Sequence, residues 1–343
     1  MRAENFTHDN HFVPQFYLQH WSQGGKKVYR YDILVPHESI PVWKHSPIKS
    51  SAYFRDLYTS IHDQEESDEF EKWIKKEFED PAKPVLDKVA KDENLSKAEW
   101  EKLIRFVALQ DVRTPTAYFE SAERWRKTLP GLIEDVLQKS IKKLESAAKN
   151  RSVIIKKANN QKSFLDEVIK GRIISEEKEG EKDEHQLEAT VLAGRQLWLY
   201  QQKLLLIKTV KALLGHSWSI FYPSAGAEWF TSDHPVVKLN YYNGTYDFGG
   251  GWGRSKTNIF MPLTPTHLLF TQIGDKDIPD RKVLSTEKTM VFQNFIAKRA
   301  GMWIYASKPL KEVEQLRPRV VDKDIFDKVL EQQNNWHVNQ SDF

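Results

Sequence analysis

The order of the hydrophobic patterns along the chain constrains its fold more than any other feature. From about residue 68 to residue 215 apolar side chains recur at helical spacing, as at Phe70, Ile74 and Phe78. From about residue 218 to residue 305 short runs of β-branched and aromatic residues alternate with turn residues, a pattern typical of strands. Helices that precede strands, rather than alternate with them, predict an α+β fold and not a doubly wound sheet.

Local signals place individual elements. Ser96 and Glu99 form a capping-box pattern that predicts the start of a helix, and Pro115 interrupts that helix because proline lacks an amide donor. We expect further helices over residues 132–148, 163–170, 184–214, 286–299 and 324–332. We expect strands over residues 28–34, 53–59, 218–222, 229–231, 236–239, 258–262, 268–272 and 303–306. The charged run 176–184 is expected to form a mobile connection.

These elements predict one composite α+β domain over residues 1–310. In this prediction a helical layer, about residues 64–215, packs on a mixed or antiparallel sheet formed mainly by residues 217–306 together with N-terminal strands. The domain then has a motif-bearing N-terminal segment (1–62), a helical region (63–215) and a sheet region (216–310). Residues 311–343 are expected to form a C-terminal helix and tail.

Composition excludes several classes of protein. The 343 residues include no cysteine, which excludes disulfides, thiolate metal sites and cysteine nucleophiles. The first ten residues lack the apolar stretch of a secretory signal, and lysine and glutamine residues interrupt the longest apolar stretch, 197–214. We therefore expect no membrane span and a cytoplasmic location. The net charge of +3 is too small to require a polyanionic partner.

One basic run has two interpretations. Between Lys139 and Lys157 there are seven lysine and arginine residues against Glu145 alone. Such a run is a candidate contact for a nucleic-acid backbone, and it is more typical of a solvated helix face.

The densest chemical cluster is the opening motif HFVPQFYL, residues 11–18. Pro14 restricts its own backbone and that of the residue before it, so His11 lies on a stiff segment with Gln15 close behind. A histidine in such a position serves as general base, metal ligand or phosphate contact. The alternative is a histidine that caps a helix beginning at Pro14.

A second cluster, residues 105–113, carries Arg105 and Arg113 among apolar neighbours. Eight residues apart, they fall on roughly one side of a continuous helix. A buried guanidinium group requires an anionic partner, which is either a substrate phosphate or carboxylate or a structural glutamate. The earlier helix offers the structural partners Glu65, Glu66, Glu69 and Glu71.

The third cluster, WFTSDHP at residues 229–235, is a strand that runs into a turn. Asp233 and His234 at its end are placed as a catalytic carboxylate or metal ligand often is. Aspartate is also a common turn residue, since its side chain bonds nearby backbone amides.

Taken together, these motifs resemble the domain of unknown function family numbered 4238, an uncharacterised group found in bacteria and fungi. The resemblance rests on residues 11–18, the helix around Glu69, the Arg-Thr-Pro step at 113–115, Thr231 to Pro235, and Pro262-Leu263. It covers about residues 8–306. Residues 19–21 (QHW) depart from the Arg, polar and Phe residues expected there, so no basic role is assigned to position 19. The resemblance implies one shared site that is formed by His11, Gln15, Arg105, Gln110, Arg113 and Asp233.

Our first functional hypothesis is a phosphodiester hydrolase, most simply a nuclease, with a bacterial defence effector or toxin as its setting. His11 would activate water or hold a divalent metal ion, Asp233 and Glu69 would be carboxylate ligands, and Arg105 with Arg113 would stabilise phosphate charge. Residues 11–14 also resemble the opening of His-Asn-His nucleases. No asparagine occurs between Asn10 and Asn94, however, so the downstream metal-holding asparagine of that motif is missing.

Two other hypotheses use the same residues. In the second, the cluster is a non-catalytic sensor or binding module for a nucleotide or another anionic ligand. In the third, it is a structural network that holds the N-terminal segment on the helical layer. The sequence contains no phosphate-binding P-loop, no Gly-x-Ser-x-Gly elbow and no His-Glu-x-x-His helix. It does not specify a protein partner or an oligomeric state.

Overall fold

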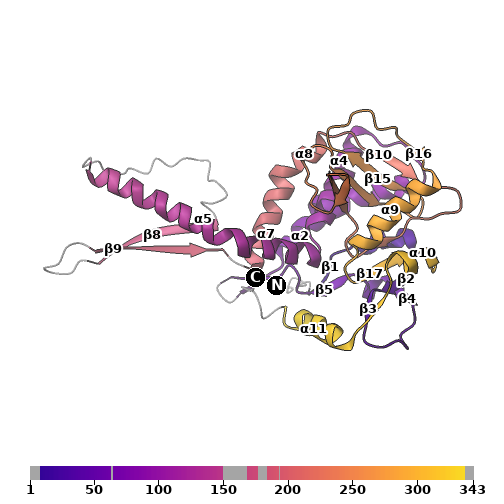
Figure 1. Cartoon of the computed structure of the whole chain (residues 1–343), viewed down its shortest axis with the longest axis horizontal. Coiled ribbons are helices and arrows are strands. Elements are labelled where there is room, and N and C mark those ends of the chain that lie inside the picture. Colours follow the sequence, from indigo (N-terminus) through magenta and orange to yellow (C-terminus); the bar gives the residue numbers. More distant parts are fainter. Residues whose placement is uncertain (1–7, 63–64, 150–167, 177–183, 193, 337–343) are drawn as a thin grey trace, which may run out of the picture. The chain divides into compact units, whose positions relative to one another are not determined.

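The chain divides into two compact units, each with its own core. The computed structural model describes residues 8–62, 65–149, 168–176, 184–192 and 194–336 (Figure 1). The first unit comprises the described residues within 1–118 and 201–339, and the second unit comprises those within 119–200. The single composite domain expected over residues 1–310 stays a prediction, and the described residues within 119–200 of the helical region form a compact unit of their own.

Two sheets form the framework of the first unit. The six-stranded sheet has the order β13-β12-β14-β15-β10-β16, antiparallel except for the parallel β10–β16 pair. Its strands are β10 (Ser219–Tyr222), β12 (Val237–Tyr242), β13 (Thr245–Asp247), β14 (Asn258–Pro262), β15 (Leu268–Gln272) and β16 (Lys282–Val283). The antiparallel four-stranded sheet has the order β11-β17-β2-β4. Its strands are β2 (Lys27–Asp32), β4 (Trp43–Pro47), β11 (Thr231–Ser232) and β17 (Trp303–Ala306).

Three two-stranded pairs complete the strands of the first unit. They are β1 (Asp9–His11) with β5 (Tyr53–Arg55), β3 (Leu34–Val35) with β18 (Val320–Val321), and β6 (Ser60–His62) with β7 (Glu65–Ser67). The first and third pairs are antiparallel and the second is parallel.

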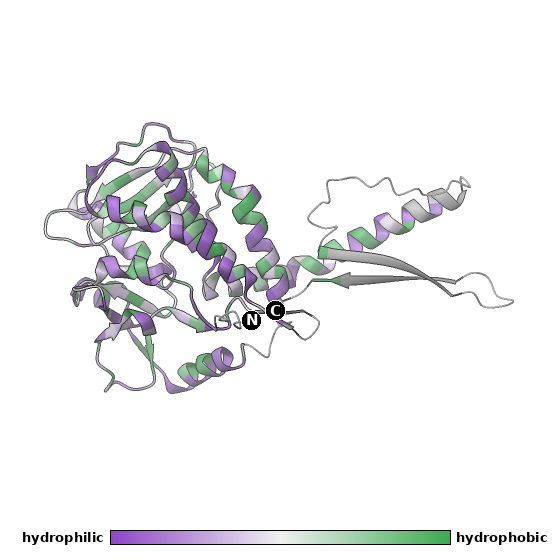
Figure 2. Cartoon of the chain, turned by 180° about the vertical axis from the view of Figure 1, so that it is seen from behind, coloured by the Kyte–Doolittle hydropathy of each residue, from purple (hydrophilic) through white to green (hydrophobic). Residues whose placement is uncertain are grey.

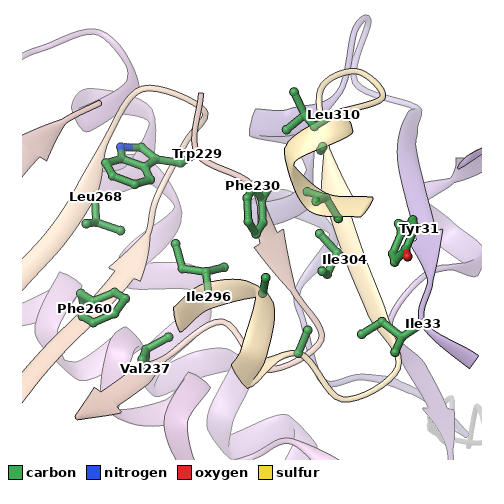
Figure 3. Packing of buried hydrophobic residues seen from close by; sticks show 14 of the residues in the cluster. Tyr31, Ile33, Trp229, Phe230, Val237, Phe260, Leu268, Ile296, Ile304 and Leu310 are labelled. Carbon is green, nitrogen blue, oxygen red and sulfur yellow. The ribbon is translucent and has the colours of Figure 1, made fainter. Parts of the chain in front are cut away.

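One hydrophobic core joins both sheets to helix α9 (Thr286–Arg299). Phe260 comes from the six-stranded sheet, Ile304 from the four-stranded sheet and Ile296 from the helix, and each is at most 1% exposed (Figure 3). Trp229 and Phe230, just before β11, lie within the same cluster. In Figure 2 the helices of the first unit carry both hydrophobic and hydrophilic residues, as expected for helices that bury one face and expose the other.

The remaining helices lie before and after the main strand region. The long helices α4 and α5 are separated at Pro115, and the capping box at Ser96 begins α4, as the sequence predicts. The 3-10 segments are η1 (Gln19–Trp21) and η2 (Ile48–Ser50), and the π-helical segments are η3 (Lys75–Glu79) and η4 (Leu205–Thr209). The α-helices are α1 (Gln15–Leu18), α2 (Glu69–Ile74), α3 (Asp80–Ala90), α4 (Lys97–Val112), α5 (Pro115–Lys149), α7 (Gly194–Leu204), α8 (Val210–Leu214), α10 (Lys311–Leu316) and α11 (Lys323–Asn334).

The second unit contains most of α5, the start of α7 and an antiparallel hairpin of β8 (Ile169–Glu176) and β9 (Glu184–Val191). Leu129, Val168 and Leu197 are its buried core residues. The helix expected over residues 184–214 is wrong for its first part, since residues 184–191 form β9. Apolar residues two apart in the second half of that strand fit a strand better than a helix.

Some expectations fall outside the described residues. The helix expected over 163–170 lies mostly outside them, and its last two residues belong to β8. The charged connection at 176–184 and the second half of the basic run at 139–157 also lie largely outside them. Lys139 and Lys142 are exposed on α5, and their contact with nucleic acid stays a prediction. Among the helices that the structure describes, none is long and apolar enough to cross a membrane.

Candidate functional site

His11 is held in one orientation at the surface of the first unit. It pairs with Tyr53 across β1 and β5, and its Nε2 atom lies 3.0 Å from the carbonyl oxygen of Lys49. A carbonyl oxygen only accepts, so Nε2 carries the hydrogen and Nδ1 keeps its lone pair. Nδ1 has no hydrogen-bond partner among the residues that the structure describes. Burial lowers the pKa of His11, so the imidazole is neutral at pH 7.

Arg113 lies directly behind this histidine and is fully buried. Its guanidinium group donates to the His11 carbonyl oxygen, to Glu79 and, over 3.0 Å, to the Tyr58 hydroxyl group. Tyr58 in turn donates to the Arg113 carbonyl oxygen over 2.8 Å. Each of the three guanidinium nitrogens therefore has a protein partner, and Arg113 joins the opening motif to the helical region. We call His11, Tyr58, Glu71, Glu79 and Arg113 the Arg113 cluster.

Glu71 is the group of this cluster whose pKa lies close to neutral pH. Burial raises its pKa to about 7, nearby Glu79 adds to that effect, and the Arg113 charge opposes it. Its Oε2 atom is buried with no hydrogen-bond partner in the described part of the chain. Its position follows from the geometry of α2, because Glu71 and Ile74 are three residues apart and face the same side.

The structure places the predicted residue Glu69 elsewhere. It is exposed at the start of α2, where its backbone N–H group faces the Ser67 hydroxyl oxygen. Residues two apart on a helix point in different directions, so Glu69 and Glu71 do not share the cluster. Sequence reasoning included Glu71 among the ion-pair partners of the arginines, but it did not find Glu79. The signal for Glu79 was weak, since it lies at the end of the π-helical segment η3, where the usual helical spacing fails.

Asp233 has a structural position in the turn after β11. Its Oδ1 atom accepts the N–H group of Gly301 over 2.9 Å, and its Oδ2 atom accepts that of Met302 over 2.6 Å. The side chain is buried, which raises its pKa to about 6 in spite of these bonds. An added Cβ atom at Gly301 would lie 3.1 Å from Oδ2, so a larger residue there would require the carboxylate to shift by a few tenths of an ångström. The carboxylate thus fixes the connection between α9 and β17, and the amides that it accepts are distant in sequence and not those of its own turn.

His234 connects the same turn to the junction of α4 and α5. Arg299 donates to its Nε2 atom over 3.0 Å, which leaves Nδ1–H to face the Thr114 hydroxyl oxygen at 3.1 Å. Burial and the Arg299 charge lower its pKa, so the ring stays neutral. A buried imidazole with a hydrogen bond at each ring nitrogen has a structural role, because it links these segments.

Tyr17 connects the opening motif to the two later motifs, residues 231–235 and Pro262-Leu263. Its hydroxyl group donates to the Pro262 carbonyl oxygen over 2.6 Å and lies 2.7 Å from the Thr231 hydroxyl oxygen. Trp21 similarly donates to the Trp229 carbonyl oxygen over 3.0 Å. The motifs that are far apart in sequence therefore meet, but mainly through aromatic residues that sequence reasoning assigned no polar role.

Among the described residues, no hydrogen bond or ion pair joins the predicted residues Gln15, Arg105 and Gln110 to the Arg113 cluster. The Arg105 guanidinium group lies 4.7 Å from the centre of the Phe78 ring. Gln110 is fully buried, and both polar atoms of its side chain lack a partner in the described residues. Gln15 is exposed on α1. Within the described ranges, no three histidine, aspartate or glutamate side chains are arranged to hold a metal ion, so His11, Glu69 and Asp233 do not form one ligand set.

Fold and site together define a class: an α+β protein whose opening motif contacts a buried arginine behind a surface histidine and reaches the later motifs through Tyr17. The family model described as "Protein of unknown function (DUF4238)" matches residues 9–309, so the chain belongs to that family. Searches of curated proteins and of solved structures found no match to this chain.

Proposed function

We propose that this chain is a phosphodiester hydrolase that uses His11 as its general base. The observation that carries the proposal is the state of the imidazole: neutral, oriented by Lys49, and with a free lone pair on Nδ1 at a partly exposed position. A base needs a fixed orientation and an unprotonated nitrogen at working pH, and His11 has both.

The roles of His11 and Arg113 follow from their contacts, and the role of Glu71 follows from its pKa. Nδ1 of His11 takes the proton of an attacking water or hydroxyl group while the new P–O bond forms. The leaving P–O bond then breaks, and the departing oxygen requires a proton. Glu71, with a pKa of about 7, supplies the cluster with a neutral carboxyl group for that transfer. Arg113 is a positioning residue, because its contact with the His11 carbonyl oxygen holds the base in place.

The first test compares His11→Ala with His37→Ala, a matched control at an exposed histidine. The full chain is assayed on bis(p-nitrophenyl) phosphate and on labelled single-stranded RNA and DNA, with and without magnesium. We expect His11→Ala to lose about 100-fold or more in kcat/KM at an unchanged melting temperature. His37→Ala should match the wild type. Equal rates for His11→Ala and the wild type would contradict the proposal, as would a wild-type chain that cleaves none of these substrates.

The pH profile gives a second test of the same roles. His11 must be unprotonated, so kcat/KM should fall toward acid pH with an apparent pKa below 6.5. Glu71 must be protonated, so kcat/KM should also fall on the alkaline side of about pH 7. Glu71→Gln should remove the alkaline limb and lower the maximum. Asp233→Asn should lower the melting temperature and leave the shape of the profile unchanged, since its oxygens serve the backbone.

A further inference from the structure

A pocket lies in the first unit, well apart in sequence from the Arg113 cluster. It has a volume of about 420 Å³ and lies between α9 and the six-stranded sheet, bordered by the loop that connects β15 to β16. Small-molecule sites in proteins typically measure about 300 to 1,000 Å³. The volume is therefore that of a site for one compact ligand.

The inner wall of the pocket is aromatic and preformed. Phe221 and Phe270 stack with ring centres 4.9 Å apart, and Phe292 meets Phe260 edge-on at 4.8 Å. The same rings belong to or pack against the main core of the unit, so their positions are set by packing and not by a ligand. Phe270 and Phe292 are partly exposed, so these two rings can present faces and edges to a planar aromatic molecule, while Phe221 and Phe260 support them from the buried side.

The rim carries side chains of both charges. Lys282 and Lys288 form no ion pair with any residue in the described part of the chain, and the same holds for Asp277 and Glu287. Asn258 also lines the pocket, and its side-chain amide makes no hydrogen bond within the described residues. Lysines at a rim favour an anionic group, whereas carboxylates and an amide favour a ligand with its own N–H or O–H donors.

We propose that this pocket binds a free nucleoside monophosphate. The base fits the aromatic wall, the ribose hydroxyls and base N–H groups fit the carboxylates and Asn258, and the phosphate fits Lys282 and Lys288. A purely apolar ligand would form no ion pair or hydrogen bond with the rim, and an inorganic anion would make no contact with the aromatic wall. The pocket shares no residue with the Arg113 cluster. The nucleotide-binding proposal can therefore be correct even if the hydrolase proposal is wrong, and the reverse also holds.

The test measures binding of AMP, GMP, CMP and UMP by titration calorimetry to the full chain, beside the matching nucleosides, inorganic phosphate and a short oligonucleotide. We expect at least one mononucleotide to bind with a Kd below about 1 mM. Lys282→Ala/Lys288→Ala should weaken that binding about tenfold or more and leave nucleoside binding unchanged. His11→Ala should bind like the wild type, which separates this site from the hydrolase.

Two tryptophan substitutions make a matched pair on α9. Val291 lines the pocket and Met290 does not, yet both are exposed (47% and 57%), so neither substitution disturbs the core. Val291→Trp should abolish mononucleotide binding and Met290→Trp should leave it intact, with both chains melting like the wild type. No binding of any mononucleotide, binding that Val291→Trp does not affect, or binding of the oligonucleotide alone would overturn the proposal.

Discussion

At the scale of single residues, most polar groups of the shared motifs form hydrogen bonds or ion pairs with other groups of the protein. Arg113 donates to Tyr58, to Glu79 and to a backbone carbonyl group, and each carboxylate oxygen of Asp233 accepts a hydrogen bond from a backbone N–H group. A buried charge is costly unless it is paired in this way, so such residues resist substitution for structural reasons alone. His11 differs because the ring nitrogen that lacks a partner among the described residues lies at a partly exposed position, whereas the unpaired atoms of Glu71 and Gln110 are buried.

Glu71 leads to a prediction about stability and pH. Its pKa in the folded chain, about 7, lies above its ordinary value of 4.5, so the folded state binds the proton more tightly than the unfolded state. The stability that this group contributes is full below about pH 4.5 and is lost as pH rises through about 7. Glu71→Gln should therefore match the wild type at pH 4.5 and exceed it by about 2 to 3 kcal/mol at pH 8.

Urea unfolding at several pH values measures this difference, with Glu69→Gln as the control. Glu69 is exposed two residues earlier on the same helix, so its substitution should leave the difference between pH 4.5 and pH 8 unchanged. Parallel curves for Glu71→Gln and the wild type would show that folding does not shift the pKa of the Glu71 carboxyl group.

At the scale of elements, helix α4 positions much of the Arg113 cluster, since Arg113 follows its last turn. Its beginning is defined by a reciprocal pair of bonds: Ser96 accepts from the Glu99 N–H group, and Glu99 accepts from the Ser96 N–H group over 2.8 Å. The end of the helix follows from Pro115, which begins α5. Both ends are therefore local properties of the sequence.

Removal of the cap should have a modest and specific cost. Ser96→Ala leaves helix amides without a partner and should lower the free energy of unfolding by about 1 kcal/mol. Lys97→Ala, at the next exposed position, should change it by less than about 0.5 kcal/mol. Urea unfolding followed by circular dichroism distinguishes the two, and equal effects would mean that the capping box does not stabilise α4.

At the scale of the whole molecule, two separate hydrophobic cores predict two separate responses to mutation. The core of the second unit contains Leu129, Val168 and Leu197, and that of the first unit contains Phe260 and Ile304. Leu197→Ala leaves a cavity in the smaller core and should destabilise that unit by about 2 to 5 kcal/mol.

Amide hydrogen exchange resolves this response by region. In Leu197→Ala the amides of β8 and β9 should exchange faster, while those of α9 and β17 keep their wild-type protection. Ile304→Ala should produce the opposite pattern. Uniform loss of protection across the chain in either variant would show that the two units unfold together.

The sequence by itself determined the fold class, the capped helix start at Ser96, helix α9, strand β17 and the family. These depend on local spacing, caps and turn residues, which a sequence displays directly. Only the tertiary structure decided that Glu71 and not Glu69 faces Arg113, that Asp233 serves the backbone of Gly301 and Met302, and that an aromatic pocket lies beside α9. The reason is physical: burial, pKa and hydrogen-bond saturation are properties of neighbours that meet only when distant segments pack together.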